Sequence, residues 1–262
     1  RLQPPAALRA QAVFALAPSF TMATTPTLLP SFDPRRVPVT GVDDHLPAVP
    51  LDRLTPAALR HRFEAPPPWQ PEVRQEPLFV DRAPVDAAVL VPLVLRADGL
   101  SVLLTERALG LSSHSGQVAF PGGKVEAGDG DVVHAALRET REEVGLADRF
   151  IDVLGQLPVY ATGSQFLVTP VVALVREGFV LHPNADEVAH AFEVPLAFLM
   201  NPAHHRRHRL EWAGGVREWF SMPYREPAHA VPGSGESAPV TEHFIWGATA
   251  GMLRNFYRFL LA

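Results

Sequence analysis

Proline is distributed unevenly along this chain of 262 residues. Sixteen of its 27 prolines lie among the first 84 residues, and eleven lie in the remaining 178. Proline lacks a backbone N–H and fixes φ, so closely spaced prolines disfavour long helices and central strands. We therefore predict that residues 1–50 are extended and poorly packed, and that the compact domain spans residues 84–262.

A short helix is expected within the proline-rich part. Thr55 can cap it, Pro56 takes its first position, and the three prolines at 66–68 end it. We expect residues 51–83 to lie against the compact domain as an attachment. This segment could also mediate a homodimer.

The first residues contain a short apolar stretch at 12–17, which follows two arginines and loosely resembles a signal or transit peptide. The run is short, and Met22 is the first methionine. We interpret residues 1–21 as a tag or as upstream translated sequence, and we expect a cytoplasmic protein. Organellar targeting by residues 1–21 stays open as the alternative.

Composition narrows the class of protein. With 47% apolar and 19% charged residues, the chain has the composition of a globular protein. A net charge of −5 gives no global basic field for nucleic acid or anionic lipid, and no apolar run reaches the about 18–20 residues of a membrane span. The absence of cysteine excludes disulfides, thiol nucleophiles and cysteine-bound metal clusters. We therefore expect no nucleic acid or membrane partner.

Strand and helix signals alternate within the expected compact domain, which favours a mixed α/β sandwich. The expected strands are 87–96, 101–105, 118–120, 151–159 and 166–175. A strand with a short helix is expected over 187–200, a hairpin over 210–219, and helices over 131–145 and 241–261.

Three glutamates share one side of the first of these helices. At about 100° per residue, Glu139, Glu142 and Glu143 fall on one arc, and Arg138 is positioned to pair with Glu142. Such close carboxylates repel one another and raise one another's pKa. A hard divalent cation such as Mg²⁺ would relieve this repulsion.

A glycine turn precedes the helix, where Gly122 and Gly123 let backbone carbonyls approach a cation because glycine has no Cβ. For isolated glutamates a solvated acidic face is the better interpretation. The combination of glycine turn, acidic loop (Glu126, Asp129) and helix is much more specific.

The stretch resembles the Nudix box, G-x5-E-x7-R-E-U-x-E-E-x-G-U, in which U is a bulky aliphatic residue. The matching residues are Gly123, Arg138, Glu139, Glu142, Glu143, Gly145 and Leu146. Asp129 stands where the first box glutamate is expected, eight residues rather than seven separate it from Arg138, and Thr140 replaces the usual aliphatic residue.

Upstream residues narrow the resemblance to one branch of this family. Residues 103–107 (LLTER), followed by Gly116 and by FPGG at 120–123, look like the L-L-T-x-R … G-x-x-x-F-P-G-G signature of coenzyme A pyrophosphatases. Members of this branch often carry the longer, aspartate-containing loop, and residues 245–250 (IWGATA) also resemble the branch. The resemblance covers about residues 50–262.

The resemblance implies a Nudix-type α/β/α sandwich with a mixed sheet, and a divalent cofactor, Mg²⁺ or Mn²⁺. Glu139 and Glu143 would be the principal metal ligands, Glu142 would bind or orient a second ion, and a carbonyl of the turn at Gly123 would complete the inner shell. Arg138 would support Glu142.

The remaining site residues are less constrained. Glu187 is our candidate for the general base, with a plain surface acid as the alternative. His114 is expected to contact substrate phosphate or to hold its loop, and Arg107 to bind a phosphate or form a surface ion pair. Gly122 and Gly123 are expected to line the substrate site.

Two further groups could recognise a nucleotide. The basic residues at 204–209 (HHRRHR) would suit the 3′-phosphate of coenzyme A, although such runs are commonly only solvated. Phe166, Trp212 and Trp219 could stack on adenine, although core packing is their commoner role.

The resemblance implies a small-molecule substrate, and the expected activity is metal-dependent hydrolysis of the diphosphate of coenzyme A or its derivatives. The products would be 4′-phosphopantetheine, or its acyl form, and adenosine 3′,5′-bisphosphate. The alternatives are a Nudix hydrolase for another diphosphate, such as ADP-ribose, NADH or a damaged dNTP, and a non-catalytic Nudix domain. Inactive domains usually lose helix glutamates, and all three are present here.

Overall fold

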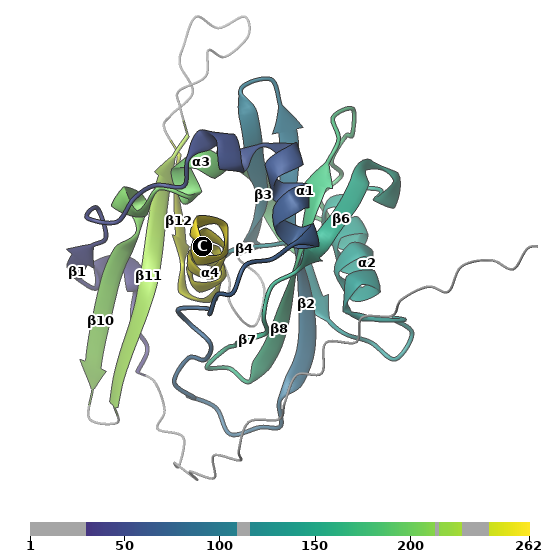
Figure 1. Ribbon diagram of the computed structural model, residues 1–262. Coiled ribbons are helices and arrows are strands. Elements are labelled where there is room, and N and C mark those ends of the chain that lie inside the picture. Colours follow the sequence, from purple (N-terminus) through teal and green to yellow (C-terminus); the bar gives the residue numbers. More distant parts are fainter. Residues whose placement is uncertain (1–29, 109–115, 213–214, 227–240) are drawn as a thin grey trace, which may run out of the picture.

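A computed structural model describes residues 30–108, 116–212, 215–226 and 241–262. Their elements form successive layers (Figure 1). Helix α2 (Val132–Val144) covers one face of a mixed eight-stranded sheet, and α4 (Gly247–Leu261) packs on the other face. A four-stranded antiparallel sheet lies beyond α4. The predicted α/β class with a mixed sheet is confirmed, and the second sheet adds a layer to it.

The central sheet is built around two parallel strands, β2 (Val85–Arg96) and β8 (Phe166–Val175). Both are nearly continuous runs of apolar residues, as expected for strands buried on both faces. The other strands are β3 (Gly99–Arg107), β4 (Val118–Ala119), β5 (Gly122–Lys124), β6 (Ile151–Gln156), β7 (Tyr160–Ala161) and β9 (Val188–Pro195).

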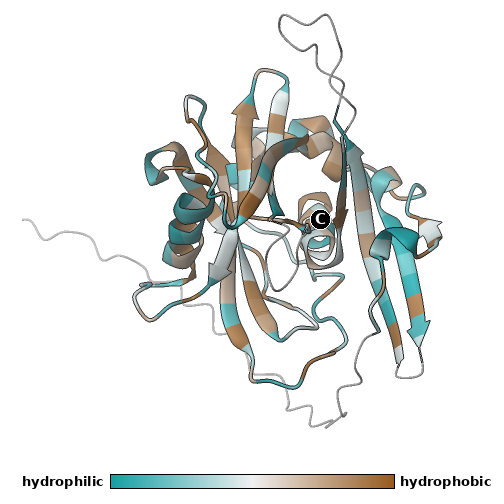
Figure 2. Cartoon of the chain, turned by 180° about the vertical axis from the view of Figure 1, so that it is seen from behind, coloured by the Kyte–Doolittle hydropathy of each residue, from teal (hydrophilic) through white to brown (hydrophobic). Residues whose placement is uncertain are grey.

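Helix α2 has well-defined ends. The side chain of Asp131 accepts a hydrogen bond from the His134 backbone N–H at 2.9 Å, and Gly145 ends the helix at φ 71°. Ala135 and Ala136 are fully buried and pack against Ala88 and Leu90 of β2, together with Val171 and Ala173 of β8. Figure 2 shows hydrophilic residues on the helix side that faces away from the sheet. The core therefore fixes which helix face carries the glutamates.

The expectation of a poorly packed segment up to residue 50 needs correction for residues 30–50. A 3-10 turn (Pro34–Arg36) is followed by β1 (Val39–Val42), which pairs with a strand of the second sheet. Val37 and Val49 are buried, and Asp43 receives two hydrogen bonds from Arg207. Long-range strand pairing and the ion pair between the buried Asp43 and the exposed Arg207 thus hold this segment despite its prolines.

The helix expected after Thr55 is present. A 3-10 turn (Leu51–Leu54) leads into α1 (Pro56–Glu64), and the Thr55 hydroxyl accepts a hydrogen bond from the Ala58 N–H at 3.2 Å. Leu59 is fully buried in the same hydrophobic core as α4. This helix is therefore part of the folded body.

The second sheet follows the order β1-β10-β11-β12, with β10 (Arg206–Trp212), β11 (Gly215–Arg225) and β12 (Glu242–Trp246). The prediction of a helix from residue 241 is wrong for its first residues, because Glu242–Trp246 pairs with β11 and α4 begins only at Gly247. The remaining short elements are α3 (Leu196–Leu199) and 3-10 turns at Asp148–Phe150 and Pro202–His204. Within the described ranges, no helix is long and apolar enough to cross a membrane.

Candidate active site

Glu143 is a buried carboxylate at the centre of the candidate site. It lies in the last turn of α2 and is only 5% exposed. Its Oε2 accepts a hydrogen bond from the Gly122 backbone N–H at 3.1 Å. The glycine turn and the carboxylate helix, which are separated by some twenty residues in sequence, are therefore in direct contact.

Glu139 lies one helical turn earlier and faces the same glycine turn. A Cβ atom added to Gly123 would lie 2.5 Å from both Cδ and Oε1 of Glu139. At Gly122, φ is 154°, and an added Cβ would lie 2.4 Å from the Ala88 carbonyl oxygen. Glycine is thus required at both positions, at Gly123 by close approach to a carboxylate and at Gly122 by close approach to β2.

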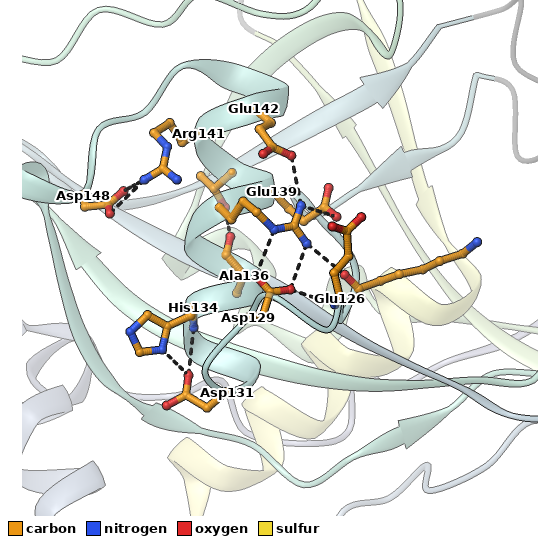
Figure 3. Close-up of polar contacts among 12 residues, drawn as sticks. Glu126, Asp129, Asp131, His134, Ala136, Glu139, Arg141, Glu142 and Asp148 are labelled. Atoms are coloured by element: carbon orange, nitrogen blue, oxygen red, sulfur yellow. Dashed lines mark hydrogen bonds and ion pairs between the residues drawn. The ribbon is translucent and has the colours of Figure 1, made fainter.

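Arg138 connects the helix with the preceding acidic loop (Figure 3). Its guanidinium donates to both oxygens of Asp129 at 2.9 and 3.0 Å, and to Glu139 and Glu142 at 3.0 Å each. It also donates to the Lys124 carbonyl at 3.1 Å. The structure thus brings Arg138 and Glu142 together as predicted, and adds Asp129 as a partner that the sequence interpretation missed. The signal was Asp129 at the first acidic position of the box pattern.

Burial governs the electrostatics of the two inward carboxylates. Desolvation raises the pKa of Glu143 to about 7, although the Gly122 hydrogen bond and the charge of Arg107 act in the opposite direction. Burial also raises the pKa of Glu139, against the lowering effect of Arg138. Repulsion from Glu139 and Glu187 adds to the upward shift of the Glu143 pKa, and repulsion from Glu142 and Glu187 adds to that of the Glu139 pKa. The site therefore holds more negative charge than its surroundings neutralise.

Glu187 reaches this charge cluster through the loop before β9. The His182 N–H donates to the Val144 carbonyl at 2.9 Å, and the Asn184 N–H donates to the Glu143 carbonyl at 2.8 Å. The loop is thereby fixed to the C-terminal end of α2, and Glu187 is close enough to repel Glu139 and Glu143. Its Oε1 lies 3.5 Å from the Asn184 amide nitrogen.

Arg107 lies at the end of β3, on the same side. Its charge favours ionised Glu143, and its Nε is buried without a hydrogen-bond partner among the described residues. A buried, unsatisfied guanidinium nitrogen is costly and is a candidate for ligand binding. His114, the other predicted phosphate contact, lies outside the described residues.

A cavity of about 1010 Å³ opens beside the glycine turn. Arg107, Gly122 and Gly123 line one side, and the opposite side is formed by the second sheet and α4, including Arg217 and Trp246. Basic side chains on its wall are Arg35, Arg107, Lys124 and Arg217. Arg217 is neutralised by Glu76 at 3.0 Å, whose other oxygen accepts a hydrogen bond from the Tyr160 hydroxyl. The cavity thus extends from the glycine turn, which contacts Glu143, to a second wall that includes part of the 245–250 stretch. The helix carboxylates themselves are not among its lining residues.

Of the aromatic residues considered for adenine stacking, Phe166 lines this cavity, whereas Trp212 and Trp219 are not part of its wall. Trp219 is instead buried against His208, with ring centroids 5.4 Å apart. Trp246, which is not among the residues predicted to stack on adenine, also lines the cavity. Phe166 and Trp246 are therefore the better stacking candidates.

The basic run at 204–209 lies mainly in β10, also outside the cavity wall. Its side chains have structural partners. His205 contacts Arg254 and the Leu199 carbonyl, His208 contacts Ser221, and Arg207 pairs with Asp43. This arrangement gives no support to a phosphate-binding role for the run.

The donor chemistry at α2 fits a hard divalent cation, because Glu139 and Glu143 offer only oxygen atoms and carry excess negative charge. Glu142 is turned toward Arg138, and its side chain is 56% exposed. Among the described residues, Glu139, Glu142 and Glu143 do not bring one ligand atom each to within 4.8 Å of one another. Glu139 and Glu143 at the glycine turn are therefore the better ligand pair, with Glu142 more distant.

Comparison with known proteins gives concordant matches. Residues 84–228 match the family model described as NUDIX domain. A protein named "Uncharacterized Nudix hydrolase NudL" from Cronobacter sakazakii is 38% identical over 170 residues, covering 64% of this chain and 79% of the relative. The protein of the same name from Shigella flexneri serotype 5b is 35% identical over 189 residues, covering 71% and 86%. A MutT/nudix family protein from Enterococcus faecalis matches at 19% identity with a TM-score of 0.40, covering 78% and 74%.

Proposed function

Because the chain belongs to the Nudix hydrolase family and is a pyrophosphohydrolase of that family, we propose that its substrate is coenzyme A or a coenzyme A derivative. Water would attack one phosphorus of the diphosphate, and the P–O–P bridge would break. The products would be 4′-phosphopantetheine, or its acyl form, and adenosine 3′,5′-bisphosphate.

One observation carries this proposal: the residues of the coenzyme A pyrophosphatase signature gather around one cavity. Arg107, Phe120, Gly122 and Gly123 all line it, although they come from β3 and from the turn before α2. Glu143 contacts the same turn through Gly122. This arrangement supports a substrate-binding role for the signature residues next to the charged helix face.

The size and charge of the cavity support a large, polyanionic substrate. Its volume of about 1010 Å³ lies at the upper end of the range of about 300–1,000 Å³ found for ligand pockets. Arg35, Arg107 and Lys124 are distributed along the wall, and Phe166 and Trp246 offer aromatic surfaces. A nucleotide with a diphosphate and a further phosphate matches this combination of cations and rings.

We propose Mg²⁺ or Mn²⁺ as the cofactor, held by Glu139 and Glu143, with Glu142 supporting a further ion and a carbonyl of the Gly123 turn near the inner shell. When bound, such a cation neutralises phosphate charge and makes water more acidic. The Gly122 N–H fixes the orientation of Glu143 at 3.1 Å, so that this carboxylate is held in place before any ligand binds.

The other side chains have separate roles in the proposal. Arg107, whose Nε is buried without a hydrogen-bond partner among the described residues, binds a substrate phosphate through its guanidinium. Glu187, close to both inward carboxylates, accepts the proton of the attacking water. Arg138 positions Asp129 and Glu142 without touching substrate.

A substrate panel tests the proposal. Coenzyme A, NADH, ADP-ribose and 8-oxo-dGTP are compared at equal concentrations with Mg²⁺ or Mn²⁺, with and without chelator, and the products are identified by mass spectrometry. We expect the highest kcat/KM for coenzyme A or an acyl form, and loss of activity with chelator. Preference for any of the other three substrates contradicts the coenzyme A assignment, and the family membership would then stand without it.

A further inference from the structure

A buried histidine between the two sheets has no hydrogen bond to the described part of the chain. His243 in β12 is 1% exposed, and neither ring nitrogen has a hydrogen-bond partner among the described residues. Its Nδ1 lies 3.7 Å from Glu106 Oε2, and its Nε2 lies 3.6 Å from Glu226 Oε2. Both distances are longer than a hydrogen bond. The ring is therefore placed between two carboxylates but bonded to neither.

A second histidine completes the group. His190 in β9 has its ring centroid 5.8 Å from that of His243, with the ring planes inclined by 11°. Three potential donor atoms, one each from His190, Glu226 and His243, lie within 4.8 Å of one another. Two donors on a zinc-type ion, each at about 2.0–2.2 Å from the metal, are separated by less than about 4.4 Å. Small side-chain adjustments would therefore bring all three atoms to one ion.

The lack of hydrogen bonds at His243 among the described residues requires an explanation, because a buried polar group without a partner destabilises the folded state. Two imidazoles and one carboxylate are a common donor set for Zn²⁺ and related ions. This set differs from the all-oxygen donors of Glu139 and Glu143. We propose that His190, Glu226 and His243 form a separate binding site for a divalent transition ion of the zinc class.

Glu106 has a supporting role in this site. It pairs with His190 across β3 and β9, and its carboxylate faces the Nδ1 of His243 while Glu226 faces the Nε2. A carboxylate on the far nitrogen of a metal-binding histidine fixes the tautomer and orientation of the ring. Glu106 is thus a positioning residue for His243.

The site would connect the two sheets. His190 belongs to the eight-stranded sheet, whereas Glu226 directly follows β11 and His243 lies in β12, both in the four-stranded sheet. An ion shared between these strands stabilises the folded state by binding it in preference to the unfolded chain. The site is therefore expected to stabilise the chain independently of hydrolysis.

Metal titration in the full chain tests the inference. The parent protein for this experiment is the full chain with Glu139→Gln and Glu143→Gln. These two changes remove the principal proposed metal ligands of the candidate active site, and chelator then removes any bound metal. Zn²⁺ binding is measured by isothermal titration calorimetry, Co²⁺ binding by visible absorption, and stability by Tm. We expect one equivalent of Zn²⁺, an intense Co²⁺ band and a raised Tm.

Matched variants assign the ligands. Since His190 is exposed, His190→Ala should fold, and we expect it to weaken Zn²⁺ binding by at least about 100-fold and to remove the Tm gain. Glu106→Gln should weaken binding by about 10–100-fold, and the exposed control His45→Ala should change nothing. His243→Asn should match His190→Ala when circular dichroism shows it folded. Absence of stoichiometric Zn²⁺ binding in the parent, or unchanged binding in His190→Ala, overturns the inference.

Discussion

At the level of single residues, Glu143 combines burial with negative charge. Only the Gly122 N–H and the nearby Arg107 favour its ionised form, and burial outweighs both, so its pKa is raised to about 7. In the folded chain this carboxyl group loses its proton near pH 7, whereas in the unfolded chain it does so near pH 4.5. The stability of the chain should reflect this change.

We predict that Glu143 destabilises the metal-free protein as pH rises. Below pH 4.5 the group is protonated in both states, and between about 4.5 and 7 the unfolded state loses its proton first, so the folded state becomes less favourable. Above pH 7 the cost levels off at about 3 kcal/mol. Urea unfolding of wild type and Glu143→Gln across this range measures it. The variant should show a flatter profile, and Mg²⁺ should stabilise wild type most above pH 7. Parallel profiles would contradict the assignment.

Gly123 allows a second residue-scale prediction. In Gly123→Ala the new Cβ would overlap the carboxylate of Glu139, which is 2.5 Å away, and would displace it from the turn. We expect kcat to fall by about 10–100-fold, because misplacement of a catalytic group by about 1 Å has effects of that size. Gly128→Ala is the matched control, since nothing lies within 4 Å of its added Cβ. Equal kcat values for the two variants would contradict the role given to Gly123.

At the level of elements, the position of α2 depends on its ends as well as on its buried alanines. The cap at Asp131 fixes where the helix starts, and therefore which residues face the glycine turn. Arg138 then connects the helix to Asp129 in the loop before that cap. Helix start, loop and glycine turn thus form one local unit.

We predict that Asp131→Ala lowers the free energy of unfolding, because it removes the N-cap acceptor for the His134 N–H. Asp131→Asn retains an acceptor and should lose much less. Chemical unfolding in urea measures both variants. If the alanine and asparagine variants were equally stable, the cap would not contribute as described.

The sequence predicts these elements well where the pattern is local. The strand Phe166–Val175 has the predicted bounds, and α2 agrees within one residue at each end because Asp131 and Gly145 are strong local signals. The predicted start of the last helix at residue 241 is wrong, because Glu242–Trp246 becomes a strand only through its pairing with β11. Pairing across the chain is not visible in local periodicity.

At the level of the whole molecule, a buried ion-pair network connects the N-terminal part to α4. Arg254 is fully buried and lies 2.8 Å from Asp43 and 2.7 Å from Glu72. Arg258 also reaches Glu72, at 2.6 Å, but is partly exposed. Two acids from the proline-rich part are therefore held by the last helix.

We predict that Arg254→Ala destabilises the protein by about 1–3 kcal/mol, because Asp43 and Glu72 lose their fully buried partner and keep only the more exposed Arg207 and Arg258. The more exposed Arg258→Ala should cost less than about 1 kcal/mol. Thermal and urea unfolding of the two variants measure the difference. Similar small losses in both would show that the network does not hold the N-terminal part in place.

Only one side of the candidate site could be predicted from the sequence, because only that side belongs to a local sequence pattern. Glu139, Glu143 and Gly122–Gly123 belong to a continuous local pattern, so the sequence brings them together. The opposite wall, with Arg217 and Trp246, comes from strands of the second sheet. Its position depends on the packing of that sheet over α4, which no local pattern encodes.

The central claim is that the carboxylates beside the glycine turn support cleavage of a diphosphate. The most direct measurement is mass spectrometry of coenzyme A after incubation with wild type, Glu143→Gln and the exposed control Glu177→Gln, each with Mg²⁺ or with chelator. We expect 4′-phosphopantetheine and adenosine 3′,5′-bisphosphate from wild type and Glu177→Gln when Mg²⁺ is present without chelator, and a rate lower by at least about 100-fold in Glu143→Gln. Wild-type turnover by Glu143→Gln, or cleavage unaffected by chelator, would contradict it.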